Sequence, residues 1–124
     1  MTDRLANRKQ RGAKSEAEAA AYLNREGWTI VARNWRCRTG ELDIVAEEKG
    51  TLVIVEVRSR NLNETYGTPS ESVNGRKQRQ IRETAEVYLH RYRVYDRQVR
   101  FDVVAIRMDR EDNVIQLEHI RNAF

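Results

Sequence analysis

Apolar residues near the start of the chain recur at the spacing of an α-helix. An alanine-rich segment from residue 12 or 13 to residue 26 is followed by Gly27, a residue common just after helix C-termini. The face predicted to point inward carries Glu16, Ala19 or Ala20, and Leu23. The pattern predicts a first helix with a glutamate on its apolar face. Residues 1–11 are polar and basic, and we interpret them as an arm or as the first turns of this helix.

The next part of the chain has the composition and alternation of β-strands. A strand is predicted at about 28–33, followed by a turn or a second short strand at 34–38. Two further strands at 41–47 and 51–59 flank the turn signal Lys49-Gly50 and form a predicted hairpin. The run LVIVEV is apolar on both faces, which predicts a central strand.

The second half of the chain adds one helix and two strands. The stretch Arg60–Gly75 contains glycine, proline and Asn-Gly, which predicts a mobile loop. A helix at about 76–92 and strands at about 99–106 and 114–120 follow. The order αβββαβ with an extra terminal strand predicts an α/β fold with a mixed central sheet flanked by helices. We expect residues 12–124 to form a single domain.

Composition limits the compartment and the partners. No apolar run approaches the roughly 18 residues of a membrane span, and the N-terminal residues lack the apolar core of a signal peptide. With a single cysteine, Cys37, we expect a cytoplasmic protein that has no structural zinc and no membrane contact. The net charge is +4, and 19 of the 23 basic residues are arginines. This balance favours an anionic partner.

The hairpin places two carboxylates close together. If its turn has two or four residues, positions summing to 99 face each other, so Asp43 lies opposite Glu56 and Glu41 opposite Arg58. A three-residue turn would shift the register by one and separate the pair. At ~4 Å two like charges repel by about 1 kcal/mol in water and about 4 near a protein surface. A divalent cation bound between the two carboxylates would reverse the sign of this interaction energy. Mg²⁺ is the natural candidate, because it takes a small number of carboxylate ligands and leaves its other positions to water and phosphate.

Several motifs together resemble one protein family. They are Gly12-x₃-Glu16 before the alanine-rich helix, Gly40-Glu41-x-Asp43, Val55-Glu56-Val57-Arg58-x-Arg60, Tyr66-Gly67, Lys77 and Arg100-Phe101-Asp102-Val103-Val104. From about Gly12 onward the chain resembles the YraN family of bacterial proteins. That family resembles the PD-(D/E)xK nuclease superfamily, which includes restriction endonucleases and archaeal Holliday junction resolvases. The resemblance implies a restriction endonuclease-like αβββαβ core.

The resemblance also implies roles for individual residues. Asp43 and Glu56 match the superfamily's metal-binding carboxylates, which implies Mg²⁺ or Mn²⁺, and Glu16 matches a helix glutamate of the resolvase branch. Arg58 stands where a lysine is usual. Arginine stays protonated in proteins, so it can clamp a phosphate but cannot act as a general base. Lys77 is the alternative source of the ammonium group.

Other charged residues have weaker assignments. We expect Glu41 to pair with Arg58 rather than to bind metal. Arg76, Lys77 and Arg79 at the start of the second helix, together with Arg60, are candidates for phosphate contact, and the alternative is a solvated helix end. Arg100 and Asp102 are expected to pair on an exposed face. Three aromatic residues, Trp28, Trp35 and Phe101, are expected in the core or at its rim rather than stacked on bases.

Three function classes follow from these observations. The first is a metal-dependent endonuclease that acts on branched, flapped or damaged DNA in repair or recombination. The second is a nucleic-acid-binding protein that keeps the nuclease fold without turnover, because of Arg58. The third is a protein interaction domain whose basic surface serves solubility. A homodimer is expected only by analogy with the resolvases.

Overall fold

The computed structural model of the protein describes residues 4–61 and 73–124, with side chains from residue 9 to residue 60 and from residue 73 onward. The Tyr66-Gly67 motif and most of the loop predicted at Arg60–Gly75 lie outside the described residues. In the described part of the chain, neither helix is long and apolar enough to cross a membrane.

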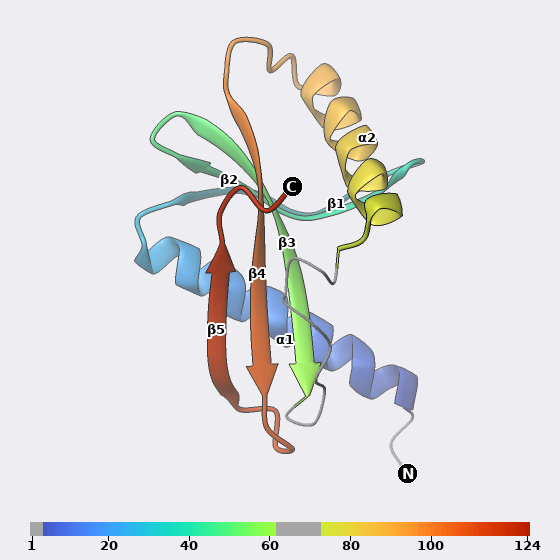
Figure 1. Ribbon diagram of the computed structural model, residues 1–124, viewed down its shortest axis with the longest axis vertical. Coiled ribbons are helices and arrows are strands. Elements are labelled where there is room, and N and C mark those ends of the chain that lie inside the picture. The colour runs from blue at the N-terminus through green and yellow to red at the C-terminus, as the bar shows by residue number, and fades with distance from the viewer. Residues whose placement is uncertain (1–3, 62–72) are drawn as a thin grey trace.

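The described residues form two helices and five strands (Figure 1). In chain order they are α1 (Arg4–Arg25), β1 (Thr29–Cys37), β2 (Gly40–Glu48), β3 (Thr51–Asn61), α2 (Gly75–Arg91), β4 (Val99–Met108) and β5 (Val114–Ile120). The strands form one sheet in the order β1-β2-β3-β4-β5, in which only β3 and β4 run parallel among the described strands. The predicted α/β fold with a restriction endonuclease-like αβββαβ order and a mixed sheet is confirmed.

The first helix is longer than predicted. It begins at Arg4 instead of residue 12 or 13, because the residues before Gly12 are mostly good helix formers and a single glycine does not break a helix. Gly12 has open space around it. At the other end Gly27 has a φ of 87°, the amide of Trp28 donates to the carbonyl of Leu23, and the amide of Gly27 donates to that of Asn24. These two bonds stop the helix at the predicted glycine.

The predicted hairpin register is confirmed from the turn as far as Ile44 and Val55. Strands β2 and β3 are joined by the two-residue turn Lys49-Gly50, whose φ angles of 49° and 86° match a type I′ turn. Pairs from Glu48↔Thr51 to Ile44↔Val55 all sum to 99. The run LVIVEV lies in β3, which is a central strand between β2 and β4 as predicted.

One strand replaces the two short segments predicted at 28–38. β1 continues through an irregularity between Ile30 and Ala32 and through Asn34, which has a φ of 53°. An asparagine tolerates this left-handed conformation well. The sequence signal at Asn34 therefore marks a kink within the strand and not its end.

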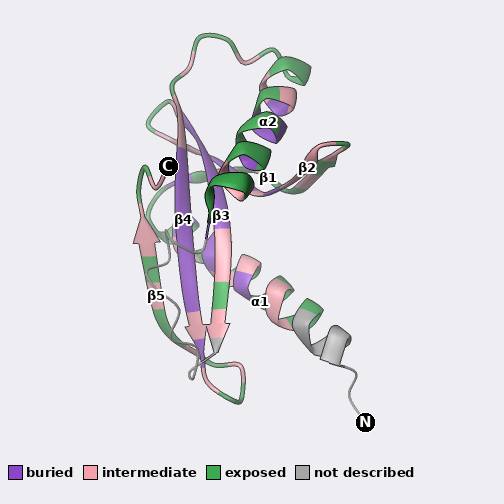
Figure 2. Ribbon diagram, turned by 45° about the vertical axis from the view of Figure 1, so that its right-hand side comes forward, coloured by how far each residue is buried: buried purple, intermediate pink, exposed green. Residues whose placement is uncertain are grey.

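Each face of the sheet is covered by one helix. Ala19 and Leu23 of α1 pack with Val53 and Val55 of β3 in one buried cluster. Ile81 and Ala85 of α2 pack with Leu52 and Ile54 in the other. Figure 1 shows α1 crossing behind β3 and β4, and Figure 2 shows that buried residues run along both strands. Trp28 and Phe101 are buried as predicted, and Trp35 lies at the rim, packed against the second cluster.

The predicted pairing of Arg100 with Asp102 is confirmed, but its predicted location is wrong. Arg100 Nε lies 2.8 Å from Asp102 Oδ1, and the Asp102 residue is fully buried. The reason is that Asp102 shares the face of β4 that carries Val104 and Ile106, which α1 covers, and that His119 and the amide of Asn122 also bond to Asp102.

A candidate metal and phosphate site where β2 leaves β3

The site lies where strand β2 parts from strand β3. Backbone pairing ends at Ile44↔Val55, and Figure 1 shows the far half of β2 swinging away from β3 together with β1. In an uninterrupted register Val57 would face Leu42. Its amide instead donates to Asp43 Oδ2 at 2.9 Å. The Asp43 carboxylate thus satisfies a backbone donor that β2 no longer reaches.

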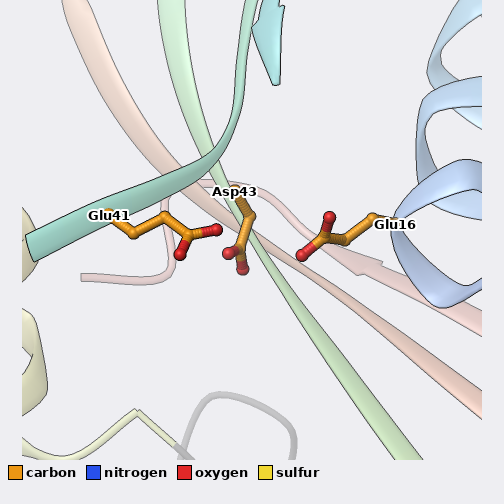
Figure 3. Close-up of side chains that lie close together, drawn as sticks. All are labelled: Glu16, Glu41 and Asp43. Carbon is orange, nitrogen blue, oxygen red and sulfur yellow. The ribbon is translucent and has the colours of Figure 1, made fainter. Parts of the chain in front are cut away.

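Three carboxylates from two elements converge at this point. Ligand oxygens of Glu16 on α1 and of Glu41 and Asp43 on β2 all lie within 4.8 Å of one another. Figure 3 shows Glu16 and Asp43 directed toward each other, with Glu41 beside Asp43. Burial and the charge of Asp43 raise the pKa of Glu16, while a hydrogen bond from the Asn34 side chain opposes the shift. This acidic group could hold a metal ion.

Glu56 on β3 adds a fourth carboxylate that is deeply buried. It is 4% exposed, and its Oε2 has no hydrogen-bond partner among the described residues. Burial first, and then the charge of Asp43, raise the pKa of Glu56 to about 8. Burial also raises the pKa of Asp43, although the Val57 amide opposes this. At neutral pH the Asp43–Glu56 pair therefore retains a proton in the absence of a cation.

Two basic side chains face these carboxylates. Lys77 Nζ lies 3.9 Å from Glu56 Oε1. The first turn of α2 holds Lys77 in place, because the Asn74 side chain caps the helix by accepting from the Lys77 amide at 3.0 Å. Arg58 follows Glu56 by two residues on β3, and its charge lowers the pKa of both Asp43 and Glu56. The buried Nε of Arg58 has no partner among the described residues.

The structure brings together most of the predicted site residues. Asp43, Glu56, Glu16, Arg58 and Lys77 meet at the point where β2 leaves β3. Their roles stay predictions.

The phosphate candidates lie farther out. Arg76 and Arg79 are exposed on the first turns of α2, on either side of Lys77. Arg60 is half-buried on β3, four residues beyond Glu56.

The predicted pairing of Glu41 with Arg58 is wrong. Glu41 Oε2 instead lies 3.1 Å from the Nε of Arg36, its cross-strand neighbour on β1. The cause is the parting of the strands, since β2 leaves β3 before Glu41 can face Arg58. Glu41 consequently joins the acidic group.

Two residues of the site were not predicted from the sequence. Arg36 pairs with Glu41, and Asn34 bonds to Glu16. The β1–β2 register, in which Arg36 faces Glu41, would have identified the first. It was missed because β1 was predicted as two segments.

The side chains present fit a hard divalent cation. They offer carboxylate oxygens, the ligand type that Mg²⁺ and Mn²⁺ prefer. Glu56 Oε2 is buried and unpartnered among the described residues, and an ion would satisfy it. The raised pKa values reflect burial first, and then the charge of Asp43 on Glu56 and of Glu41 on Asp43, and a nearby cation would offset both causes.

Comparison with known proteins identifies the family. A family model described as "Uncharacterised protein family UPF0102" matches residues 15–106. A UPF0102 protein of Moorella thermoacetica is 46% identical over 117 residues, covering 94% of this chain and 97% of the relative. One from Persephonella marina is 44% identical over 114 residues, covering 92% of each.

Among solved structures, an FdxN element excision controlling factor protein from Anabaena variabilis is similar. It is 19% identical with a TM-score of 0.31, and the match covers 77% of this chain and 90% of that one. A similarity of this degree supports no inference. The family model and the relatives show that the chain belongs to the UPF0102 family, which the motifs indicated under the name YraN.

Proposed function

We propose that the protein is a Mg²⁺- or Mn²⁺-dependent endonuclease that hydrolyses phosphodiester bonds in DNA. One observation carries the proposal. A buried glutamate with an unpartnered oxygen, Glu56, meets Asp43 from β2 and Lys77 from α2 at the point where the sheet opens. A raised pKa together with an unsatisfied buried oxygen is typical of a binding or catalytic site, and this combination supports the proposal.

In this proposal Asp43 and Glu56 hold the cation. Glu16, together with Glu41, binds or orients a water molecule at the edge of the cation site. When bound, the ion supplies Lewis-acid stabilisation of the phosphoryl oxygens and lowers the pKa of a bound water. Glu16 is suited to accept a proton from that water, because its own pKa is raised by burial.

The two basic side chains divide the role of the usual lysine. Arg58 stays protonated, so it serves as a clamp for the phosphate and stabilises negative charge in the transition state. Lys77 supplies the ammonium, and its 3.9 Å separation from Glu56 Oε1 supports a position beside the proposed cation. Arg76 and Arg79 extend the positive charge along the substrate backbone.

A cleavage screen tests the proposal. Branched, flapped, single-stranded and fully paired DNA are incubated with Mg²⁺ or Mn²⁺ and with the native protein, Asp43→Ala or Asp96→Ala. Asp96 is an exposed aspartate outside the site and serves as the matched control. We expect cleavage by the native protein and by Asp96→Ala, and a loss of at least about 100-fold in Asp43→Ala.

Two results would overturn the proposal. One is equal cleavage by Asp43→Ala and the native protein. The other is tight, salt-dependent binding with no cleavage of any substrate by either ion, which would instead establish the nucleic-acid-binding protein without turnover.

A further inference from the structure

An aromatic cluster lies at the rim of the molecule, between β1 and the C-terminal end of α2. We call Trp35, Arg91 and Tyr92 the aromatic rim. Trp35 Nε1 donates to the Tyr92 hydroxyl at 3.1 Å, and Arg91 Cζ lies over the Trp35 ring, 5.1 Å from its centroid. Beneath them the buried Tyr88 ring meets Trp35 edge to face at 5.2 Å. The cluster is thus held from below and open above, where Tyr92 is 53% exposed.

The aromatic rim lies close to the carboxylates. Trp35 pairs with Leu42 on β2, and Leu42 directly precedes Asp43. Paired Cα atoms are about 5 Å apart and consecutive ones 3.8 Å, so the Cα atoms of Trp35 and Asp43 are within about 9 Å. A DNA strand advances about 3.4 Å per nucleotide in the B form. The exposed Tyr92 lies farther away, because it caps the opposite end of α2 from Lys77, and fifteen residues at a rise of 1.5 Å span about 22 Å. A base on the rim would therefore lie about three to seven nucleotides from a phosphate at Asp43.

The charge around the rim suits a nucleic-acid backbone. Strand β1 contains no acidic residue, and two exposed arginines lie close to Trp35 in the chain, namely Arg36, which pairs with Glu41, and Arg38 just beyond the strand. On the helix side Arg91 is followed closely by the exposed Arg93. Aromatic faces combined with a track of cations are how proteins bind single strands without reading their sequence.

We propose that the aromatic rim stacks an unpaired base of the strand whose phosphodiester lies at Asp43 and Glu56. In the structure the Arg91 guanidinium covers the Trp35 ring. A stacked base would take the same kind of position over an aromatic ring. The inference rests on the proposed function and narrows its substrate class. A fully paired duplex has no free base to offer, so the preferred substrate contains a single-stranded segment beside the cleaved bond.

The two tryptophans of the chain provide a direct test in the full-length protein. Trp28 is 4% exposed in the core, whereas Trp35 belongs to the rim. The native protein, labelled with fluorotryptophan, is titrated in EDTA with a short oligodeoxythymidine and with a blunt duplex, and fluorine NMR follows both residues. We expect the oligodeoxythymidine to shift the Trp35 resonance and leave that of Trp28 in place, and the duplex to shift neither.

Substitution of the exposed ring provides the second arm. In fluorescence anisotropy, Tyr92→Ala should weaken oligodeoxythymidine binding about tenfold. The control Tyr95→Ala should bind like the native protein, because Tyr95 is 67% exposed and lies outside the rim.

Three outcomes would overturn the inference. The first is an unchanged Trp35 resonance when bound oligonucleotide saturates the protein, and the second is equal affinity of the two tyrosine variants. The third is a Trp35 shift that follows protein concentration without DNA, since the rim would then pack against a second copy. Failure of the nuclease proposal can be distinguished from failure of this inference. A Trp35 shift on DNA binding without metal-dependent cleavage would support base stacking and refute only the proposed nuclease activity.

Discussion

Two buried carboxylates on the neighbouring parallel strands β3 and β4 have opposite properties. Asp102 is fully buried and lies within 3 Å of hydrogen-bonding atoms of Arg100, His119 and Asn122. Burial alone would raise the pKa of Asp102, but bonds to these partners outweigh it and hold the pKa below its ordinary value. Glu56 is 4% exposed, and its pKa is raised to about 8.

The difference between them is the number of partners and not the depth of burial. His119 links Asp102 to the Tyr22 hydroxyl, and Arg100 links it to Glu48, so the network around Asp102 is satisfied. Among the described residues, Glu56 has a lysine at 3.9 Å and the charge of Arg58, but its Oε2 accepts no hydrogen bond and the charge of Asp43 repels it. A satisfied buried carboxylate stabilises the fold, and an unsatisfied one is typical of a binding or catalytic site.

Removal of Asp102 should have the largest effect on stability. Asp102→Ala leaves Arg100 and His119 without their buried partner, and we expect the free energy of unfolding to fall by about 3–5 kcal/mol. Urea denaturation measures this, with Asp96→Ala as the control for loss of an exposed aspartate. A change below about 1 kcal/mol would show that the Asp102 network is not structural.

Glu56→Gln should raise the free energy of unfolding, by at most a few kcal/mol, whereas Asp102→Ala lowers it. The folded pKa of Glu56 is about 8 against an ordinary value of 4.5, so the unfolded chain releases this proton first as the pH rises. The native protein should therefore lose stability between about pH 4.5 and pH 8, and Glu56→Gln should remove that slope. The contribution of Asp102 has the reverse sign, since its lowered pKa gives stability that is lost only at acid pH.

Denaturation of the native protein and of Glu56→Gln, each at about pH 5 and about pH 8 and without divalent cations, measures the slope. If the two proteins show the same pH dependence, the burial of an unsatisfied Glu56 is not what distinguishes the site.

The smallest expected effect distinguishes the roles of the two basic side chains of the site, Arg58 and Lys77. Lys77→Met should reduce cleavage by about 10- to 100-fold, because it removes the ammonium beside Glu56. Arg58→Lys keeps a positive charge at its position and should retain cleavage. Lys9→Met, an exposed lysine on α1, is the matched control in single-turnover assays. Loss of cleavage in Arg58→Lys with none in Lys77→Met would exchange the roles assigned to these residues.

The parts of this site that could be predicted are those set by local geometry. The two-residue turn at Lys49-Gly50 fixes the register of β2 and β3, and with it the approach of Asp43 to Glu56. The basic residues at the start of α2 likewise place Lys77 at one end of that helix. Such features depend on a few neighbouring residues and need no knowledge of the remaining fold.

The parts that could not be predicted depend on packing between distant segments. The pairing of β2 with β3 stops at Ile44, and no residue type there signals it. Thr39 bonds to Thr84 of α2, and Trp35 packs on Tyr88, so α2 holds the far half of the β1–β2 hairpin away from β3. For that reason Glu41 meets Arg36 and not Arg58.

The most direct test of the central claim is calorimetric titration of the native protein and of Glu56→Gln with Mn²⁺ near neutral pH, in two buffers of different ionisation enthalpy. We expect saturable binding to the native protein with release of up to about one proton, because the cation displaces the proton retained by Asp43 and Glu56. Glu56→Gln should bind Mn²⁺ more weakly and without that release. Absence of saturable binding to the native protein, or equal binding and proton release in both proteins, would contradict the central claim.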